Sequence, residues 1–195
     1  MANAKGAILL GPIKFLKQRR ADAARVVPAA LAHYLETDIR VSSWYPEVDF
    51  IGLVNAAAQL MPGTREEAIE RMGVLGAQIH EDVYGDLIHA LSSSSTFALW
   101  STQHDSGELR GVWEMPTSSR LELVDFDAPS AENCILVRGY ARGGLVANGL
   151  EDVRVEELTC VLRGAALCSW RATWKDQDAT PVTPGRRPRR SASLR

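Results

Sequence analysis

The stretch EELTCVLRGAALCSW, residues 156–170, holds two of the three cysteines in the chain, Cys160 and Cys168, with Gly164 midway between them. The residues alone leave four interpretations open: a disulfide, a redox pair, half of a metal site, or small thiols that fill the core. An odd number of cysteines makes a poor disulfide framework. Because thiols stay reduced in the cytosol, a disulfide is the less favoured interpretation if the protein is cytosolic.

The composition is ordinary for a soluble globular protein. The chain has 195 residues, of which 46% are hydrophobic and 24% charged, and this length is enough for one domain with its own core. The apolar stretch GAILLGPI at 6–13 is too short for a signal peptide, and no apolar run is long enough to span a bilayer. We therefore expect a cytoplasmic protein with no membrane span.

The charge is unevenly distributed along the chain. The net charge is −2, yet residues 176–195 carry +3 and the remainder carries −5. Residues 176–195 have almost no apolar side chains, a pattern that predicts a disordered basic tail. Its few arginines do not name a partner, so nucleic acid is not an expected target.

The first half of the sequence has the apolar spacing of helices. Residues 21–37 form one such pattern, in which Pro28 is expected to start or kink a helix. Residues 44–61 form a second pattern, with Pro46 at a suitable first helical position.

A third helical pattern, at 62–85, begins with a capping box. Thr64 is the expected N-cap, and Glu67 follows three positions later. A separate short helix is predicted at 86–92.

Beyond the serine run at 92–95 the pattern changes to strands. Segment 128–149 is ambiguous, because Ser130 could cap a helix while the residues after it would also suit a strand. His104 is expected in a solvated turn. Helices followed by a small, mostly antiparallel sheet with one helix packed on it define the α+β class. Strands are predicted at 96–102, 108–115, 119–126, 150–160 and 168–175.

The third cysteine, Cys134, raises the possibility of a metal site. Zinc takes four ligands, mainly thiolate and imidazole, and Cys160 and Cys168 flank a short loop that could bring both sulfurs to one ion. The fourth ligand would then be Glu157 or Glu156. In a regular strand Glu157 and Cys160 face opposite ways, so a shared ion requires a bulge between them. On chemistry alone, core filling is favoured over a metal.

Two segments, CILVRGYARGGLV at 134–146 and VRVEELTCVLRGAALCSW at 153–170, together resemble the 4-vinyl reductase domain. The broader superfamily includes sensor domains of aromatic-responsive activators, haem-based nitric oxide sensors and TRAPP-type trafficking subunits. The resemblance covers about residues 95–175. The residues that carry it are Cys134, Gly139, Tyr140, Glu157, Cys160, Gly164 and Cys168.

The resemblance implies a helix over 130–148 and a structural zinc ion held by Cys134, Glu157, Cys160 and Cys168. Four protein ligands would close the site, so the zinc would stabilise the fold and would not catalyse. A pocket for a small ligand between the helices and the sheet is also implied. Its candidate residues are Trp113, Phe97, Trp100, Tyr140, His80 and His89.

These features lead us to expect a zinc-stabilised regulatory domain over residues 1–175, with a helical lead-in at 1–93 and the sheet plus helix at 94–175. It would sense a small hydrophobic or aromatic ligand and signal as a homodimer or through a protein partner. We expect no enzyme, since the sequence has no nucleophile elbow, phosphate loop or dinucleotide fingerprint. The alternative is a TRAPP-like scaffold or dimerisation module.

Overall fold

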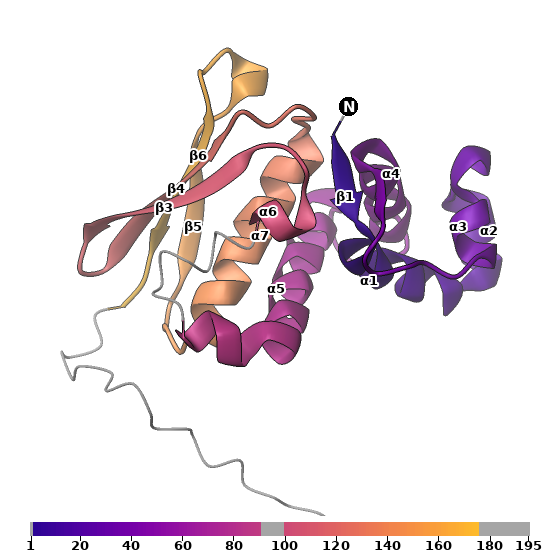
Figure 1. Ribbon diagram of the computed structural model, residues 1–195, viewed down its shortest axis with the longest axis horizontal. Coiled ribbons are helices and arrows are strands. Elements are labelled where there is room, and N and C mark those ends of the chain that lie inside the picture. Colours follow the sequence, from indigo (N-terminus) through magenta and orange to yellow (C-terminus); the bar gives the residue numbers. More distant parts are fainter. Residues whose placement is uncertain (1, 91–99, 176–195) are drawn as a thin grey trace, which may run out of the picture.

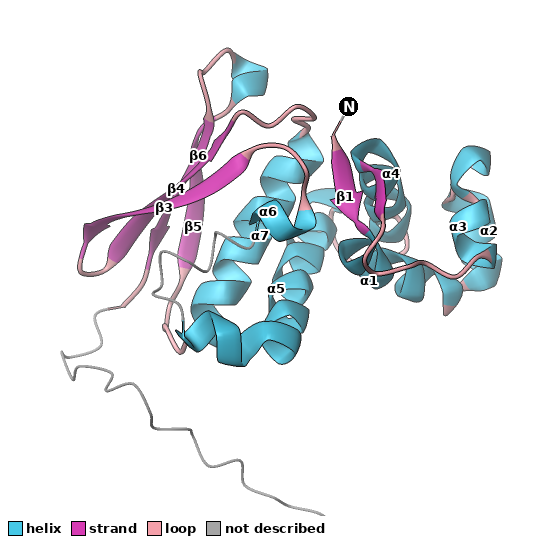
Figure 2. Ribbon diagram, in the orientation of Figure 1, coloured by secondary structure: helices cyan, strands magenta, loops and turns pink. Residues whose placement is uncertain are grey.

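The computed structural model describes residues 2–90 and 100–175, without the side chains of residues 80–90 and 113 (Figure 1). Helices fill the first half of the chain and an antiparallel sheet dominates the second, which confirms the α+β class. Figure 2 shows α7 (Ala131–Ala147) beside the sheet and α5 (Arg65–Ala90) next to α7. No helix within the described ranges is both long and apolar enough to cross a bilayer. The predicted tail lies outside the described residues.

The N-terminal helices pack around an apolar core of their own. Helix α1 (Gly6–Lys17) packs on α4 (Glu47–Ala58), and Leu9, Leu16 and Leu53 from these helices are fully buried. Burial of such side chains supplies about 1.5–3 kcal/mol each. The smaller elements of this half are β1 (Asn3–Lys5), α2 (Arg20–Val26), η1 (Ala29–Leu31), α3 (His33–Glu36) and β2 (Trp44–Pro46).

Two prolines mark helix boundaries in this half. Pro28 follows α2 and is the N-cap residue of η1, so it divides the 21–37 pattern, as expected. Pro46 is the N-cap residue of α4. It therefore lies one position before the helix, and Glu47 occupies the first helical position.

The start of α5 has the predicted capping box. The Thr64 N–H donates to the Glu67 carboxylate at 2.8 Å, and the Glu67 N–H donates to the Thr64 hydroxyl at 3.2 Å. Both bonds satisfy donors that a helix start leaves unpaired, and the hydrogen bonds from Thr64 lower the pKa of Glu67. Helix α5 continues to Ala90, so the separate helix predicted at 86–92 is wrong.

The sheet has the strand order β3-β4-β6-β5, with every neighbouring pair antiparallel. Leu121 and Trp170 pair across β4 and β6 and are fully buried, while Arg120 and Arg171 alternate with them and pair with Glu114. This alternation places an apolar face against α7 and a charged face toward solvent. The strands are β3 (Glu108–Met115), β4 (Ser118–Val124), β5 (Arg154–Thr159) and β6 (Cys168–Thr173).

The strand predicted at 96–102 is wrong where the chain is described. Residues 100–103 form the short helix α6 (Trp100–Gln103), while 96–99 lie outside the described residues. Helical spacing places Trp100 and His104 one turn apart, and their rings stack with centroids 3.8 Å apart. This tertiary packing overrides the strand preference of an aromatic-rich segment.

Helix α7 resolves the ambiguous segment 128–149. The Ser130 hydroxyl accepts a hydrogen bond from the Asn133 N–H at 3.1 Å and caps the helix. Gly139 does not break the helix, because it lies at the contact with α5. A Cβ atom at Gly139 would lie 2.1 Å from the carbonyl oxygen of Glu70. Only a residue without a side chain permits this approach of the two backbones.

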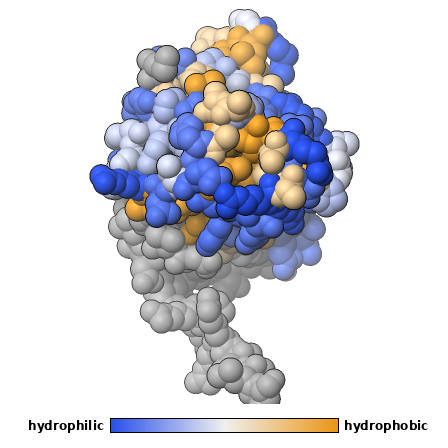
Figure 3. Space-filling model, turned by 90° about the vertical axis from the view of Figure 1, so that its right-hand side faces the viewer, coloured by the Kyte–Doolittle hydropathy of each residue, from blue (hydrophilic) through white to orange (hydrophobic). Residues whose placement is uncertain are grey.

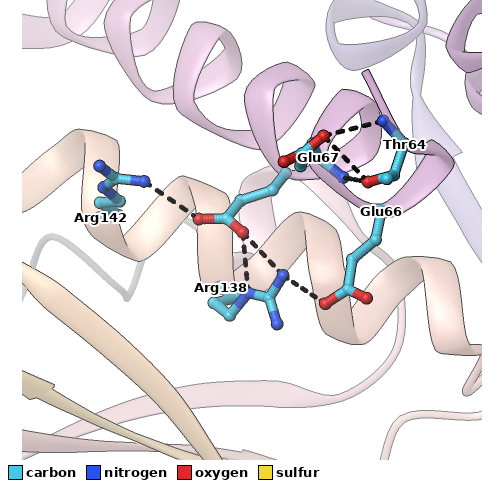
Figure 4. Close-up of polar contacts among 6 residues, drawn as sticks. Thr64, Glu66, Glu67, Arg138 and Arg142 are labelled. Atoms are coloured by element: carbon cyan, nitrogen blue, oxygen red, sulfur yellow. Dashed lines mark hydrogen bonds and ion pairs between the residues drawn. The ribbon is translucent and has the colours of Figure 1, made fainter.

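Ion pairs flank the same helix contact (Figure 4). The Arg138 guanidinium on α7 donates to Glu66 at 2.8 Å and to Glu70 at 2.7 Å on α5, and Arg142 lies 3.3 Å from Glu70. Arg138 and Glu70 are each about four-fifths buried. Partial burial strengthens such pairs relative to exposed ones, so charges and close backbone packing both hold α5 and α7 together.

Candidate functional site

A cavity of about 380 Å³ lies between the N-terminal helices, α5 and α7. Its volume is within the range of about 300–1,000 Å³ that is usual for small-molecule sites. Aliphatic and aromatic side chains form most of its wall, among them Ile8, Phe15, Phe50, Val54, Met72, Leu136 and Val137. Its polar lining residues include Lys14, Gln18, Gln103, His104, Asn133 and Tyr140.

Glycines leave this space open. Gly11 on α1 and Gly76 on α5 line the cavity, and a Cβ atom at either position would meet no atom within 4 Å. Leu75 and Ile79, also on α5, line it as well and are 46% and 49% exposed. The cavity therefore reaches solvent at a rim made partly of apolar side chains.

His104 forms a buried pair with Glu47 in the wall of this cavity. Nδ1 of His104 lies 3.0 Å from Oε2 of Glu47, and the two residues are only 8% and 1% exposed. The expectation of a solvated His104 is therefore wrong. Since Nδ1 is occupied by the carboxylate, Nε2 is the nitrogen left to bind a ligand.

Aromatic rings fix the plane of the His104 imidazole. Trp100 stacks on it with an interplanar angle of 14°, and Phe126 meets it edge-on with centroids 5.9 Å apart. The indole N–H of Trp100 donates to the Ser106 carbonyl at 3.0 Å, which fixes the indole in turn. These contacts restrict rotation of the imidazole, so its nitrogens keep their directions.

The N-terminal strand β1 contacts the His104 segment through backbone and side-chain hydrogen bonds. Ala4 forms an antiparallel bridge with His104, and Asn3 donates to the Asp105 carboxylate through its backbone and side-chain nitrogens, each at 2.6 Å. These hydrogen bonds lower the pKa of Asp105. The Glu47 N–H donates to the carbonyl of Ala2 at 3.0 Å. Ala2, just before β1, and Ala4, within β1, therefore contact Glu47 and His104 respectively.

A second buried polar group lies beside the histidine. Gln103 lines the cavity and is 5% exposed, and its Oε1 atom has no hydrogen-bond partner among the described residues. Its amide nitrogen donates to the Thr102 hydroxyl at 3.2 Å. An unpaired buried acceptor costs about 1–3 kcal/mol, so a donor on a bound molecule or a water would stabilise this position.

The predicted pocket residues are only partly placed by the structure. Trp100 and Tyr140 line the cavity. Phe97 and the side chains of Trp113, His80 and His89 lie outside what the structure describes. Sequence reasoning missed His104 and Glu47 as a site. The four-residue spacing of Trp100 and His104, which allows the two rings to stack on a helix turn, was the one local signal of this site. No sequence pattern near either residue indicates its contact with Glu47.

The three cysteines come together beneath α7. The Cys134 sulfur lies 3.8 Å from the sulfurs of Cys160 and Cys168, which are 4.0 Å apart, and all three residues are buried. Gly164, with φ of +84°, closes the loop that places Cys160 and Cys168 side by side. Burial and the neighbouring thiols raise the pKa of Cys134, and burial also raises that of Cys168. Sulfurs this close could contact one metal ion.

Glu157 does not join this cluster in the structure. The strand register shifts between Glu157 and Thr159, so the bulge that a shared site would require is present. The Glu157 carboxylate nevertheless accepts from the Arg163 guanidinium at 2.9 Å and is partly exposed. The group of ligand atoms within 4.8 Å of one another consists of the three cysteines.

We predict that the three thiols resist modification in the folded protein. The thiolate is the reactive species, and burial both raises the pKa of Cys134 and Cys168 and blocks access. A colorimetric thiol reagent at pH 8 should titrate almost no thiol in the native protein and all three in guanidinium. Rapid stoichiometric labelling of the native protein would contradict the observed burial.

Comparison with solved structures identifies the architecture. An H-NOX protein from S. oneidensis in the Fe(II)NO ligation state superposes with a TM-score of 0.65 at 12% identity, covering 88% of this chain and 99% of that one. The fold is that of the H-NOX domains. An oxygen-binding H-NOX domain related to soluble guanylate cyclases, in its oxygen complex, superposes with a TM-score of 0.61 at 14% identity, covering 94% of this chain and 100% of that one. A structure from work on haem distortion in the H-NOX family superposes with a TM-score of 0.60 at 14% identity, with the same coverage of both chains.

These findings bear on two sequence-based predictions. The fold is shared with H-NOX proteins, while no family profile and no curated protein matches the sequence, and the narrower 4-vinyl reductase assignment stays a prediction. The predicted cofactor, structural zinc, is wrong by the same comparison. The S. oneidensis structure is described in an Fe(II)NO ligation state, and a second similar structure is described by the distortion of its haem.

Proposed function

We propose that the chain is a cytoplasmic, non-enzymatic regulatory domain that binds haem in the cavity, where His104 would hold the iron. The observation that carries this proposal is the buried His104–Glu47 pair, whose histidine lies in a mostly apolar cavity wall. An imidazole held through Nδ1 by a carboxylate is the usual arrangement of a metal-binding histidine. Proximal histidine ligation is one of the common ways in which proteins hold haem iron.

The remaining residues of the cavity fit a flat apolar ring with acidic groups at one edge. Val54, Leu136 and Val137 offer apolar contact, and Lys14 is the cationic side chain among the described lining residues. Lys14 is exposed, so it could pair with a carboxylate at the rim without desolvation. When bound, haem would supply an iron centre able to take a diatomic gas, the ligand type named for the H-NOX structures.

This chain's residues would act by holding and shielding the group. His104 would anchor it, Trp100 and Phe126 would keep the imidazole plane fixed, and the apolar wall would exclude water. A shift of His104 would act directly on Ala4 and Asp105, which connect it to β1. Binding of the ligand would thus change the position of β1 and of the N-terminal helices that pack on it.

An apolar surface supports an output through a protein partner or a second copy. Figure 3 shows apolar residues gathered on the face presented by the N-terminal helices. Exposed apolar side chains of this half are Leu10, Val41, Trp44 and Val48. Such patches commonly mark protein interfaces. The same surface would serve the alternative function, a scaffold with no ligand.

Haem titration of the purified protein tests the proposal. We expect wild-type protein to give an intense Soret band that saturates at one equivalent of hemin. Because a coordinate bond is lost, His104→Gly should weaken binding by at least about tenfold, and free imidazole should restore the band by occupying the vacated space. His33→Gly is the control, since His33 is exposed and its imidazole contacts the Ala30 carbonyl and the Tyr34 ring, neither of which lines the cavity.

Each result separates the candidates. If wild-type protein gives no Soret band, the haem proposal fails, and a small aromatic probe tests the same cavity for the simpler apolar ligand. If His104→Gly binds hemin as tightly as wild type, His104 does not hold the iron. Saturation with neither hemin nor an aromatic probe would favour the scaffold.

A further inference from the structure

Glu47 is a buried acid with an unusual set of contacts. It occupies the first position of α4 and is 1% exposed, and its Oε2 atom contacts Nδ1 of His104. Its Oε1 atom has no hydrogen-bond partner among the described residues. The imidazole is therefore the one side chain, within the described part of the chain, that hydrogen-bonds this carboxylate.

Glu47 lies in the first turn of α4. The first turn of a helix carries a partial positive charge from unpaired N–H groups, which stabilises a nearby carboxylate. Asp49 also lies in the first turn of α4, but it accepts from the Tyr34 hydroxyl at 2.7 Å and so has its own donor. A carboxylate oxygen accepts hydrogen bonds, and His104 donates one to Oε2 of Glu47 only when Nδ1 carries a proton.

We propose that Glu47 is a positioning residue that keeps the proton of neutral His104 on Nδ1, leaving Nε2 as an unprotonated lone pair for the ligand in the cavity. A free imidazole exchanges its proton between both nitrogens, and only the Nδ1–H form can ligate through Nε2. The carboxylate also increases the electron density that the ring can donate to a metal.

Of the two parts of this inference, the His104 tautomer and the ligand affinity, only the second depends on the haem proposal. The tautomer of His104 is a property of the chain without any ligand and follows from the His104–Glu47 contact alone. The effect on ligand affinity rests on the proposed function. A measurement on ligand-free protein therefore tests the first part even if hemin does not bind.

Nitrogen NMR of ligand-free, ¹⁵N-histidine-labelled protein at neutral pH reads the tautomer directly. His104→Gln identifies the His104 signals by their loss. In wild-type protein we expect a protonated Nδ1 and an unprotonated Nε2. Glu47→Leu removes the acceptor and should shift the proton to Nε2, while Glu47→Gln keeps a neutral acceptor and should retain the Nδ1–H form.

Hemin titration of the same variants tests the second part. Loss of a histidine's outer partner typically weakens metal binding about 10–100-fold, so Glu47→Leu should fall in that range. Glu47→Gln should bind less tightly than wild type, since it keeps the orientation but loses the charge. Glu132→Leu is the matched control. It removes another first-turn acid, which pairs with Arg65 on a different helix and does not contact His104.

The outcomes are decisive in either direction. A protonated Nε2 in wild-type protein overturns the inference, and so does an unchanged tautomer in folded Glu47→Leu. If Glu47→Leu does not fold, the wild-type spectrum still tests the tautomer of His104, and the hemin affinity of Glu47→Gln still tests the effect of Glu47 on binding. A wild-type protein that shows the Nδ1–H tautomer but takes up no hemin supports the role of Glu47 and refutes the haem proposal separately.

Discussion

Gly139→Val is expected to lower the free energy of unfolding by about 3 kcal/mol or more, the upper range for overpacked cores. A Cβ atom at this position would lie 2.1 Å from the carbonyl oxygen of Glu70 and 2.9 Å from its carbonyl carbon. Backbone atoms cannot rotate away as a side chain can. Helices α5 and α7 would have to separate, and the Arg138 ion pairs would break with them. Urea unfolding followed by circular dichroism measures the change.

Gly144→Ala is the control for this substitution. Gly144 lies on the same helix, but a Cβ atom there would meet nothing within 4 Å. Alanine should therefore stabilise the helix by up to about 1 kcal/mol, the difference in helix propensity. If Gly139→Val unfolded at the same urea concentration as wild type, the close approach of α5 and α7 would be wrong.

Gly76→Phe is expected to abolish ligand binding without unfolding the protein. Gly76 lines the cavity on α5 and faces open space, so a phenyl ring can occupy the volume that a ligand needs. We expect hemin affinity to fall at least about 100-fold, while the free energy of unfolding stays level or rises because the new ring is buried. Hemin titration and urea unfolding of one preparation measure both quantities.

Two further variants make this result specific. Gly11→Phe blocks the same cavity from α1 and should reproduce the loss of binding. Gly144→Phe adds the same side chain on α7, where Gly144 does not line the cavity, and should leave affinity unchanged. Full hemin binding by Gly76→Phe would place the ligand outside the cavity.

Features decided by neighbouring residues were predictable from the sequence. The Thr64–Glu67 capping box, the helix break at Pro28 and the Ser130 cap depend on contacts within a few positions. The strands of the sheet were found for the same reason, since alternation is a local pattern. The α+β class follows from the order of these elements.

The site depended on contacts between distant residues, and there the sequence was misleading. His104 follows a short aromatic stretch and precedes a turn, so it was expected in water. Its burial depends on Glu47, 57 positions earlier, and on Ala4, near the start of the sequence. The cysteine cluster was easier to foresee, because Cys160 and Cys168 share a short loop with a glycine that permits the tight turn.

The strand β1 has a practical consequence for experiments on this protein. Ala2 is buried, and its carbonyl accepts the hydrogen bond from Glu47. An affinity tag or fluorescent fusion joined directly ahead of this residue would begin beside Glu47 and would strain the pairing of Ala4 with His104. Tags for binding measurements therefore belong after residue 175, and an untagged preparation is the proper reference for every titration.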